Sequence, residues 1–543
     1  MIYLEEQLQI LVCVDRSKIS LYMPKKVIIA SDAQIVVDAG AAVANRGGNA
    51  VDAAIAATLS SMSTNLGIIS PGASGFITIW RKGENPIVID AYAEMPGRGL
   101  DSVKFGSGMK EAFFDYGGGT STMVGYGSVA TPGIFAGLGL AAEKYGNLPW
   151  SEIVAPAQQQ VEKGFPLSRV AAEYFSYTHQ IIFGWHPDSY QVIHKADGSY
   201  LQLGDMVKLP QLAKSLQSIA EGGVDVLYRG ELGEKITTEI QANQGLLTLE
   251  DLAYYRAIER SPIIINFGDW EIATNPSPAV GGTCLAAMLL LMDKRLTSLY
   301  PKRRSQYEWN AETVRQIAEI QQAVLQYRSN YLEGVSKELI EPAAARLLAM
   351  AAKDDWQQLT KSPSTIHISA VDSDGLACSI SASSGYGSGV MAGGTGLWLN
   401  NSLGEIELHP QGLHDLSPGT RLTSNMAPTV CRHADGSVLA IGSPGASRIT
   451  TALAQVLFNF ISLDLPLKKA ISHPRLHFEV FNSTPAIAFE TGLNVEALNL
   501  TSRQFEGLSM YFGGVQAACW SPTNGLTAAA DPRRTGGIAW GEN

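Results

Sequence analysis

The sequence from residue 365 reads Thr365-Ile366-His367-Ile368-Ser369-Ala370-Val371, then Asp372-Ser373-Asp374-Gly375, then Leu376-Ala377-Cys378-Ser379-Ile380-Ser381-Ala382. Ile366, Ile368 and Ala370 recur with a period of two, which predicts a β-strand with one apolar face. Asp374-Gly375 is typical of a hairpin turn, so the second run is expected to pair with the first. Asp-x-Asp-Gly also opens calcium loops, but the later ligands are missing here, which favours the turn.

The hairpin predicts which residues lie beside Thr365. With Asp374-Gly375 at the centre of the turn, Ser383 and Ser384 lie beside Ile366 and Thr365, give or take one register step. The pairing therefore brings serine hydroxyls next to Thr365.

Helical patterns dominate the chain before this hairpin, and short β-type runs dominate after it. Gly47-Gly48 suit the end of one helix, and Asn49 can cap the next. Helices are expected over residues 34–43, 50–59, 136–144, 150–163, 211–221 and 311–331, and strands over residues 76–81 and 87–91. No internal repeat or biased linker stands out, which favours one interlocked unit.

Composition excludes several classes of protein. The chain has 543 residues, of which 45% are hydrophobic and 17% are charged, so it can bury a large core. The net charge of −11 and the absence of a Lys/Arg-rich run argue against a nucleic-acid partner. The five cysteines are widely spaced, with no Cys-x-x-Cys pair, and are predicted to be buried reduced thiols.

Membrane and export signals are not expected. No apolar stretch approaches the roughly 18 residues that a membrane-spanning helix needs. The apolar run from Leu8 to Val14 is short, and Glu5-Glu6 precede it where an export signal would carry Lys or Arg. We therefore expect a cytoplasmic protein, with a periplasmic or secreted one as the alternative if the start site is misassigned.

The sequence indicates neither a metal nor an organic cofactor. It lacks a phosphate-binding Gly-x-x-x-x-Gly-Lys-Ser/Thr loop and a His-Glu-x-x-His zinc motif. Residues 137–142 mimic a dinucleotide fingerprint but lie within a predicted helix, which favours core packing. His409, His414 and His433 lack tight ligand spacing and are interpreted as surface histidines.

Small residues follow an apolar strand pattern in Ala440-Ile441-Gly442-Ser443-Pro444-Gly445-Ala446-Ser447-Arg448-Ile449, and a helix is expected at residues 450–460. Such a turn brings backbone N–H groups together at a helix N-terminus, where they can hold an oxyanion or a carboxylate. By itself the pattern also fits a plain strand-to-helix turn. Ser443 does not fit a Gly-x-Ser-x-Gly nucleophile elbow, because Ile441 replaces the first glycine.

An ordered series of motifs resembles gamma-glutamyltranspeptidase from about Ile28 to the C-terminus. Each motif alone is modest, but their order along the chain makes the resemblance specific. The motifs are Gly47-Gly48-Asn49-Ala50-Val51-Asp52, Thr131-Pro132-Gly133, Tyr145-Gly146-Asn147-Leu148-Pro149-Trp150, Gly164-Phe165-Pro166, Leu247-Thr248-Leu249-Glu250-Asp251-Leu252, Thr365-Ile366-His367, Gly394-Thr395-Gly396-Leu397-Trp398, Gly442-Ser443-Pro444-Gly445 and Asp531-Pro532-Arg533.

The resemblance implies an α+β fold, the four-layer αββα sandwich of N-terminal nucleophile hydrolases. It implies an extension over residues 1–26, a large subunit over 27–364 and a small subunit over 365–543, both within one interlocked domain. The chain would cut itself between Ser364 and Thr365. The freed α-amine of Thr365, with a pKa near 8, would then act as base for the hydroxyl of the same residue.

By the same resemblance, further residues receive catalytic roles. Backbone N–H groups at Gly445 and Ala446 would stabilise the oxyanion of the tetrahedral intermediate. Ala446 replaces the second glycine that is usual in the family. Ser383 matches the hydroxyl partner of the nucleophile, as the hairpin pairing indicates independently.

The predicted acyl-binding residues depart from the family pattern. Tyr92 stands where the family has an arginine that binds the glutamyl α-carboxylate, and Arg98 could compensate. Glu405 replaces the usual aspartate that binds the α-amine. Ser424 and Asn425 remain as polar contacts with the substrate. A family asparagine falls at or beside Gly385.

Three functions remain open. The first is an amidohydrolase or acyltransferase of gamma-glutamyl amides, a small-molecule substrate class. The second keeps the nucleophile but takes another acyl group, as cephalosporin-acylase-like relatives do, and Tyr92 argues for it. The third is an unprocessed, noncatalytic member.

Overall fold

The computed structural model describes residues 25–114, 119–296, 299–300, 309–333, 337–354, 365–409, 412–481 and 483–542. Most of the predicted extension over residues 1–26, together with Ser364, lies outside this part of the chain. Within it, no helix combines the length and the apolar character needed to cross a membrane.

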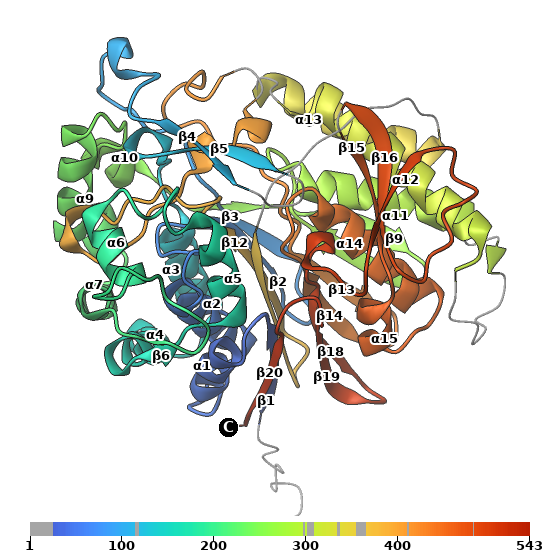
Figure 1. Ribbon diagram of the computed structural model, residues 1–543. Coiled ribbons are helices and arrows are strands. Elements are labelled where there is room, and N and C mark those ends of the chain that lie inside the picture. The colour runs from blue at the N-terminus through green and yellow to red at the C-terminus, as the bar shows by residue number, and fades with distance from the viewer. Residues whose placement is uncertain are drawn as a thin grey trace, which may run out of the picture.

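Two β-sheets form the centre of the molecule (Figure 1). The first has the order β20 (Gly537–Glu542), β1 (Lys26–Ser31), β11 (Ile366–Asp372), β12 (Ala377–Ser383), β2 (Ser74–Trp80), β3 (Ile87–Ala91) and β8 (Ile258–Arg260). The second has the order β19 (Gly525–Ala530), β18 (Gln516–Ser521), β14 (Val438–Gly442), β13 (Thr429–His433), β10 (Trp270–Thr274) and β9 (Ile263–Phe267).

Smaller sheets lie outside this centre. They are β15 (Leu476–Phe481), β16 (Thr484–Glu490) and β17 (Thr501–Phe505), the pair β4 (Lys110–Phe114) and β5 (Thr120–Val124), and the pair β6 (Phe165–Pro166) and β7 (Met206–Val207).

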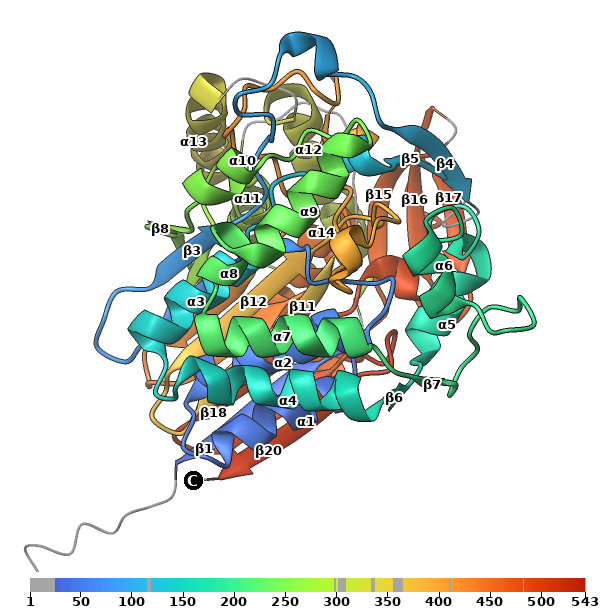
Figure 2. The same cartoon turned by 90° about the vertical axis from the view of Figure 1, so that its left-hand side faces the viewer.

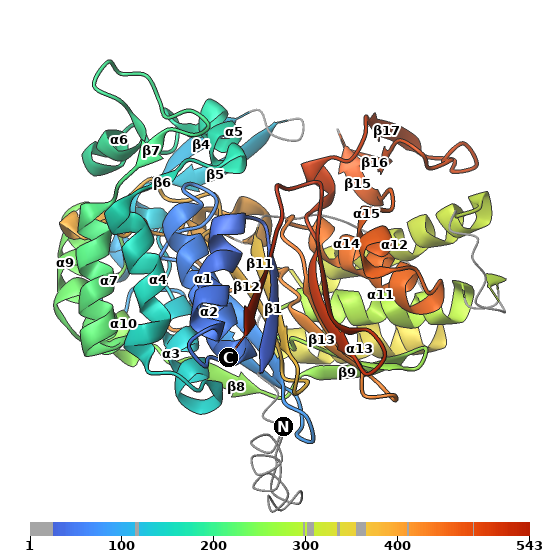
Figure 3. The same cartoon turned by 90° about the horizontal axis from the view of Figure 1, so that it is seen from below.

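Helices cover the outer face of each central sheet (Figure 3). The group on the side of the first sheet comprises α1 (Gln34–Ala44), α2 (Ala50–Thr64), α3 (Ile134–Tyr145), α4 (Trp150–Lys163), α5 (Arg169–Thr178), α6 (Pro187–Ile193), α7 (Pro210–Gly222), α8 (Asp225–Tyr228), α9 (Glu231–Ala242) and α10 (Leu249–Tyr254). Figure 2 looks onto this side, where α4 packs on α2 and α7 packs on α4.

The helices on the side of the second sheet are α11 (Gly281–Leu296), α12 (Ala311–Tyr331), α13 (Lys337–Lys353), α14 (Arg448–Leu457) and α15 (Leu467–Ser472). The helix predicted at residues 450–460 is α14, which begins two residues earlier and passes into a π-helix at Phe458–Ser462.

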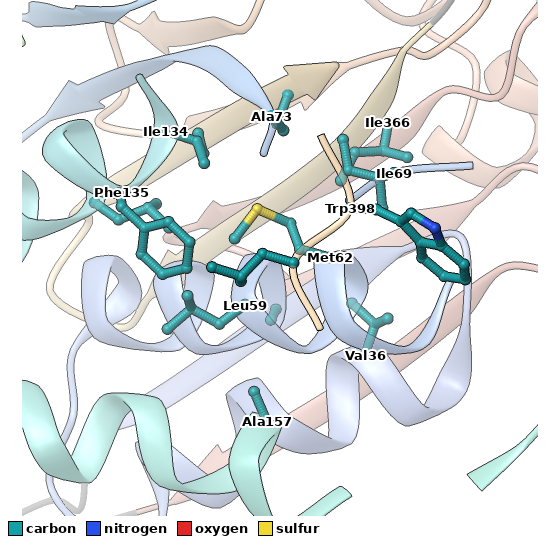
Figure 4. Packing of buried hydrophobic residues seen from close by; sticks show 14 of the residues in the cluster. Val36, Leu59, Met62, Ile69, Ala73, Ile134, Phe135, Ala157, Ile366 and Trp398 are labelled. Atoms are coloured by element: carbon teal, nitrogen blue, oxygen red, sulfur yellow. The ribbon is translucent and has the colours of Figure 1, made fainter. Parts of the chain in front are cut away.

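Side chains that alternate along the strands give the first sheet two apolar faces, so it packs against a layer on each side. Ile366 and Ile368 of β11 join the core beneath the first helix layer, whereas Val371 joins an apolar cluster between the two sheets. Figure 4 shows part of the first core, with Leu59 and Met62 of α2 near Ile366. A further core lies between the second sheet and its helices. The four-layer αββα sandwich is confirmed.

Both central sheets contain strands from the part of the chain before residue 365 and from the part after it. β11, β12 and β20 complete the first sheet beside strands from before this residue, while β9 and β10 from before it complete the second. Each sheet therefore needs both parts of the chain. The subunit boundary itself stays a prediction.

The predicted hairpin forms, but its strand register is shifted by one residue from the pairing that the sequence predicts. Ile366 pairs with Ala382, which sets Thr365 opposite Ser383 rather than Ser384. The loop has three residues, Ser373 to Gly375, with Gly375 at φ 80°, so the turn is centred on Asp374. The difference falls within the one-step allowance.

Candidate active site

Thr365 directly precedes β11, at one end of this inner strand of the first sheet, and 7% of its surface is exposed. Because side chains alternate along a strand, Thr365 shares the face of His367, toward the second sheet. Ser383 ends the neighbouring strand β12 opposite Thr365, and its Oγ accepts a hydrogen bond of 3.0 Å from Gly385 N–H. The two predicted hydroxyls are therefore neighbours on one face.

His367 is a buried polar residue beside Thr365 to which the sequence analysis gave no role. Its Nδ1 lies 2.8 Å from Ser381 Oγ and its Nε2 lies 2.9 Å from Ser369 Oγ. Burial lowers the pKa of His367 to about 3, so the imidazole is neutral near pH 7. Its place two residues from Thr365 in a strand is the sequence signal that could have found it.

The predicted strand-to-helix turn follows β14 and leads into α14. Gly445 has φ 129° and Ala446 has φ 64°, so Ala446 occupies a region that an L-residue enters at a cost of about 1–2 kcal/mol. Within the described residues, the N–H groups of Gly445 and Ala446 donate no hydrogen bond. Two backbone donors at a helix N-terminus are thus available to an anion.

This turn begins close to β11. A Cβ atom at Gly442 would lie 2.2 Å from Cε1 of His367, so the last residue of β14 packs on the imidazole. Ser379 of β12 donates to the carbonyl of Ile441 at 3.0 Å. These contacts bring the end of β14 to the same edge of the sandwich as the start of β11.

Tyr92, Glu405 and Ser424 come together although they are far apart in the sequence. Tyr92 follows β3 and stacks on Phe76, with ring centroids 5.3 Å apart. Burial raises the pKa of the Tyr92 phenol, the Glu405 carboxylate adds to this shift, and a hydrogen bond with Ser424 opposes it. Three of the predicted acyl-binding residues, Tyr92, Glu405 and Ser424, therefore form one buried polar cluster.

Gly385 connects this cluster to the strand that carries Ser383. It has φ 63°, and a Cβ atom there would lie 2.3 Å from Asn401 Oδ1 and 3.2 Å from the carboxyl carbon of Glu405. Asn401 donates to Thr122 Oγ1 at 2.9 Å and accepts from Tyr386 N–H at 2.7 Å. The Asn401 amide thus lies directly against the position where an asparagine side chain of the family would begin.

Asn425 is buried with 4% of its surface exposed. Its Nδ2 and Oδ1 have no hydrogen-bond partner within the described residues. Buried amides are normally paired, and leaving one unpaired costs about 1–3 kcal/mol. Within the described residues, the Asn425 amide beside Ser424 is therefore available to a ligand.

Arg98 does not join the cluster through its observed contacts. Its guanidinium lies 3.4 Å from Asp251 Oδ1 and 3.6 Å from Glu94 Oε2. Arg421, which the sequence analysis did not single out, lies closer to Tyr92 because its Nη1 donates to the Tyr92 carbonyl at 2.6 Å. That contact engages the backbone and not the phenol.

Histidines and cysteines give no sign of a metal centre in the part of the chain that is described, where no group of three candidate ligands occurs. His409 is buried and bonds to the carbonyl of Ser402 at 2.9 Å, so its interpretation as a surface residue is wrong. Burial lowers the pKa of His409 to about 4. The described cysteines are free and buried, as predicted, and Cys13 lies outside the described residues.

Comparisons with known proteins agree along nearly the whole chain. The family model described as gamma-glutamyltranspeptidase matches residues 37–541. A glutathione hydrolase proenzyme of Escherichia coli (strain K12) is 28% identical over 94% of this chain and 90% of its own length. One from Pseudomonas aeruginosa is 29% identical, with 91% of each chain covered. The crystal structure of cephalosporin acylase from Bacillus halodurans shares the fold, with a TM-score of 0.77 at 24% identity over 95% of this chain and 96% of its own.

Proposed function

The chain belongs to the gamma-glutamyltranspeptidase family, and from this premise we propose that it is a self-cleaving threonine amidohydrolase or acyltransferase. The observation that carries the proposal is the hairpin register, which sets Thr365 opposite Ser383 on the face toward the second sheet, at the end of the sandwich that the Gly445-Ala446 turn also reaches. The named relatives are proenzymes, which supports maturation by cleavage.

Maturation begins at the peptide bond before Thr365. The Thr365 hydroxyl attacks the carbonyl carbon of Ser364, the C–N bond breaks, and the Ser364 acyl group passes to the Thr365 oxygen. Water then hydrolyses this ester and leaves a carboxylate on Ser364 with a free amine and hydroxyl on Thr365. The two fragments stay together because each central sheet contains strands of both.

Catalysis uses the same residue. The Thr365 amine takes the proton of its own hydroxyl, whose oxygen attacks the substrate amide carbonyl. The N–H groups of Gly445 and Ala446 stabilise the oxyanion. The tetrahedral intermediate expels the amine, which takes the proton, and water or an acceptor amine then releases the acyl group from Thr365.

The acyl group binds at the cluster of Tyr92, Glu405, Ser424 and Asn425. Glu405 supplies a buried negative charge for an α-amine, and the Asn425 amide is available for hydrogen bonds. We propose a gamma-glutamyl amide as the substrate. Tyr92 supports a second candidate, an acylase for a different acyl group, because a neutral phenol replaces the guanidinium that binds an α-carboxylate.

A denaturing gel and N-terminal sequencing test the cleavage. Fragments of 364 and 179 residues, about 39 and 19 kDa, are expected, with the smaller one beginning at Thr365. A single uncleaved chain in active material would overturn the mechanism. Rates with a gamma-glutamyl anilide, compared with anilides of other acyl groups, then decide between the two substrates.

A further inference from the structure

We propose that Arg534 binds a carboxylate on the amine portion of the substrate, the part released when the acyl group moves to Thr365. This inference rests on the proposed function and adds to it a preference for substrates whose leaving amine carries an anionic group, such as an amino acid with a free carboxylate. None of the predicted acyl-binding residues takes part in it.

The site is a small pocket that begins at Gly385. Its walls include the rings of Tyr174, Tyr177 and Tyr386 and the side chain of Met510, and Arg534 contributes the positive charge. Contacts with neighbouring residues hold two of these aromatic side chains. Tyr174 donates a hydrogen bond to the Tyr386 carbonyl at 2.8 Å, and Tyr177 stacks on Phe114. The pocket therefore pairs an apolar surface with one guanidinium.

The guanidinium of Arg534 is buried but is not neutralised by a direct contact within the described residues. Only 6% of the residue is exposed, and its side chain makes no hydrogen bond or ion pair within the described residues. Gly514 leaves room for it, because a Cβ atom there would lie 2.5 Å from Arg534 Cδ.

The charge that faces Arg534 is Asp32. Burial raises the pKa of the Asp32 carboxyl, and the charge of Arg534 opposes that shift. Asp32 Oδ1 accepts hydrogen bonds from Ser31 Oγ at 3.1 Å and from Asn65 Nδ2 at 3.2 Å. The Arg534 donors thus stay available, although a buried arginine is normally hydrogen-bonded.

Two contacts connect this pocket to the candidate nucleophile. Gly385, which lines the pocket, lies two residues beyond Ser383 and donates to its Oγ. Met510 begins a short 3₁₀ helix that ends at Phe512, and the next residue, Gly513, packs against Gly445 in the oxyanion turn. The pocket therefore borders the Thr365 edge of the sandwich.

The positions of the acyl cluster and the pocket indicate where each end of the substrate binds. Gly385 touches Glu405 of the acyl cluster and also lines the pocket, so the two sites meet there. An amide attacked at Thr365 has an acyl end and an amine end. With the acyl end at Glu405, the amine end extends toward the pocket, which is small enough that its arginine receives the carboxylate while the rest of the amine lies outside.

Binding of the free amine tests this inference separately from catalysis. Calorimetry on the full-length protein would compare 5-amino-2-nitrobenzoate with 4-nitroaniline, which lacks the carboxylate. We expect the carboxylated amine to bind about ten-fold more tightly, and the Arg534→Gln variant to lose that preference. Arg46→Gln, which alters an exposed arginine that donates to the Glu152 carbonyl, is the matched control and should keep it.

Kinetics supply the second measurement. The ratio of kcat/KM for gamma-glutamyl-3-carboxy-4-nitroanilide over gamma-glutamyl-4-nitroanilide should fall about ten-fold in Arg534→Gln and be largely kept in Arg534→Lys. Equal binding of the two amines by the unmodified protein would overturn the inference, as would an unchanged preference in a folded Arg534→Gln variant. Absence of cleavage before Thr365 would contradict the proposed function. The calorimetric comparison of the two amines would still test the inference, because binding does not depend on cleavage.

Discussion

Gly442, the last residue of β14, packs directly on the imidazole of His367 in β11, and a methyl group at Gly442 would lie 2.2 Å from Cε1 of that ring. This contact joins the strand that precedes the oxyanion turn to the strand that follows Thr365. The distance between the two central sheets near Thr365 therefore depends on a residue without a side chain.

Gly442→Ala should move the sheets apart at this edge. We expect the free energy of unfolding to fall by about 1–3 kcal/mol, as for other overpacked cores. Cleavage before Thr365 should slow as well, because the Gly445-Ala446 turn follows β14 directly. Urea unfolding and a time course on denaturing gels check both, and a variant with normal stability and normal cleavage would contradict the packing argument.

Thr365→Ala should give an intact, folded and inactive chain, because the attacking hydroxyl is lost. Thr365→Ser keeps a hydroxyl and should retain part of the cleavage and of the activity. Gels, circular dichroism and an anilide assay measure these outcomes. Efficient splitting of Thr365→Ala would remove the assignment of the nucleophile.

Asn425→Leu should increase the stability of the fold and decrease the activity. The substitution removes a buried amide that has no partner among the described residues and keeps a similar volume, so the free energy of unfolding should rise by about 1 kcal/mol while kcat/KM falls. Asn401→Leu is the matched control, since its amide is hydrogen-bonded to Thr122 and Tyr386 and its loss should destabilise the fold. Equal destabilisation in both variants would argue against a free amide at Asn425.

His367 should make the fold sensitive to acid. Its pKa is about 3 when folded, below the ordinary value near 6.5, so between these values the unfolded chain binds a proton that the folded chain excludes. Stability is thus unaffected above pH 6.5 and falls as the pH decreases. Between pH 7 and pH 5, wild type should lose about 2 kcal/mol more than His367→Gln in urea unfolding. Parallel losses would show that the imidazole is not buried as a neutral group.

Ala446→Gly should relieve backbone strain at the oxyanion turn. Ala446 has φ 64°, where glycine is favoured by about 1–2 kcal/mol, although glycine also gains freedom in the unfolded chain. The net expectation is a gain in unfolding free energy of up to about 1 kcal/mol with activity retained, since only the backbone N–H takes part. A large loss of activity would assign a role to the methyl group.

Local patterns were sufficient for much of the fold. The helix at residues 150–163 and the strand at residues 87–91 were predicted with the bounds that the structure has, because period and capping depend on residues within a few positions. The motifs also indicated Thr365 and the Gly445-Ala446 turn. The buried state of His409 was missed, since burial depends on what packs over a residue from elsewhere in the chain.

The amino-acid sequence by itself determined the hairpin, the serine hydroxyls beside Thr365 and the family. Only the tertiary structure decided that Tyr92, Glu405 and Ser424 share one buried cluster, that Arg98 pairs with Glu94 and Asp251, and that Arg534 lies in a pocket beside Gly385. The reason is physical, because alternation along a strand follows from neighbouring residues, whereas contacts between segments hundreds of residues apart depend on how sheets and helices pack.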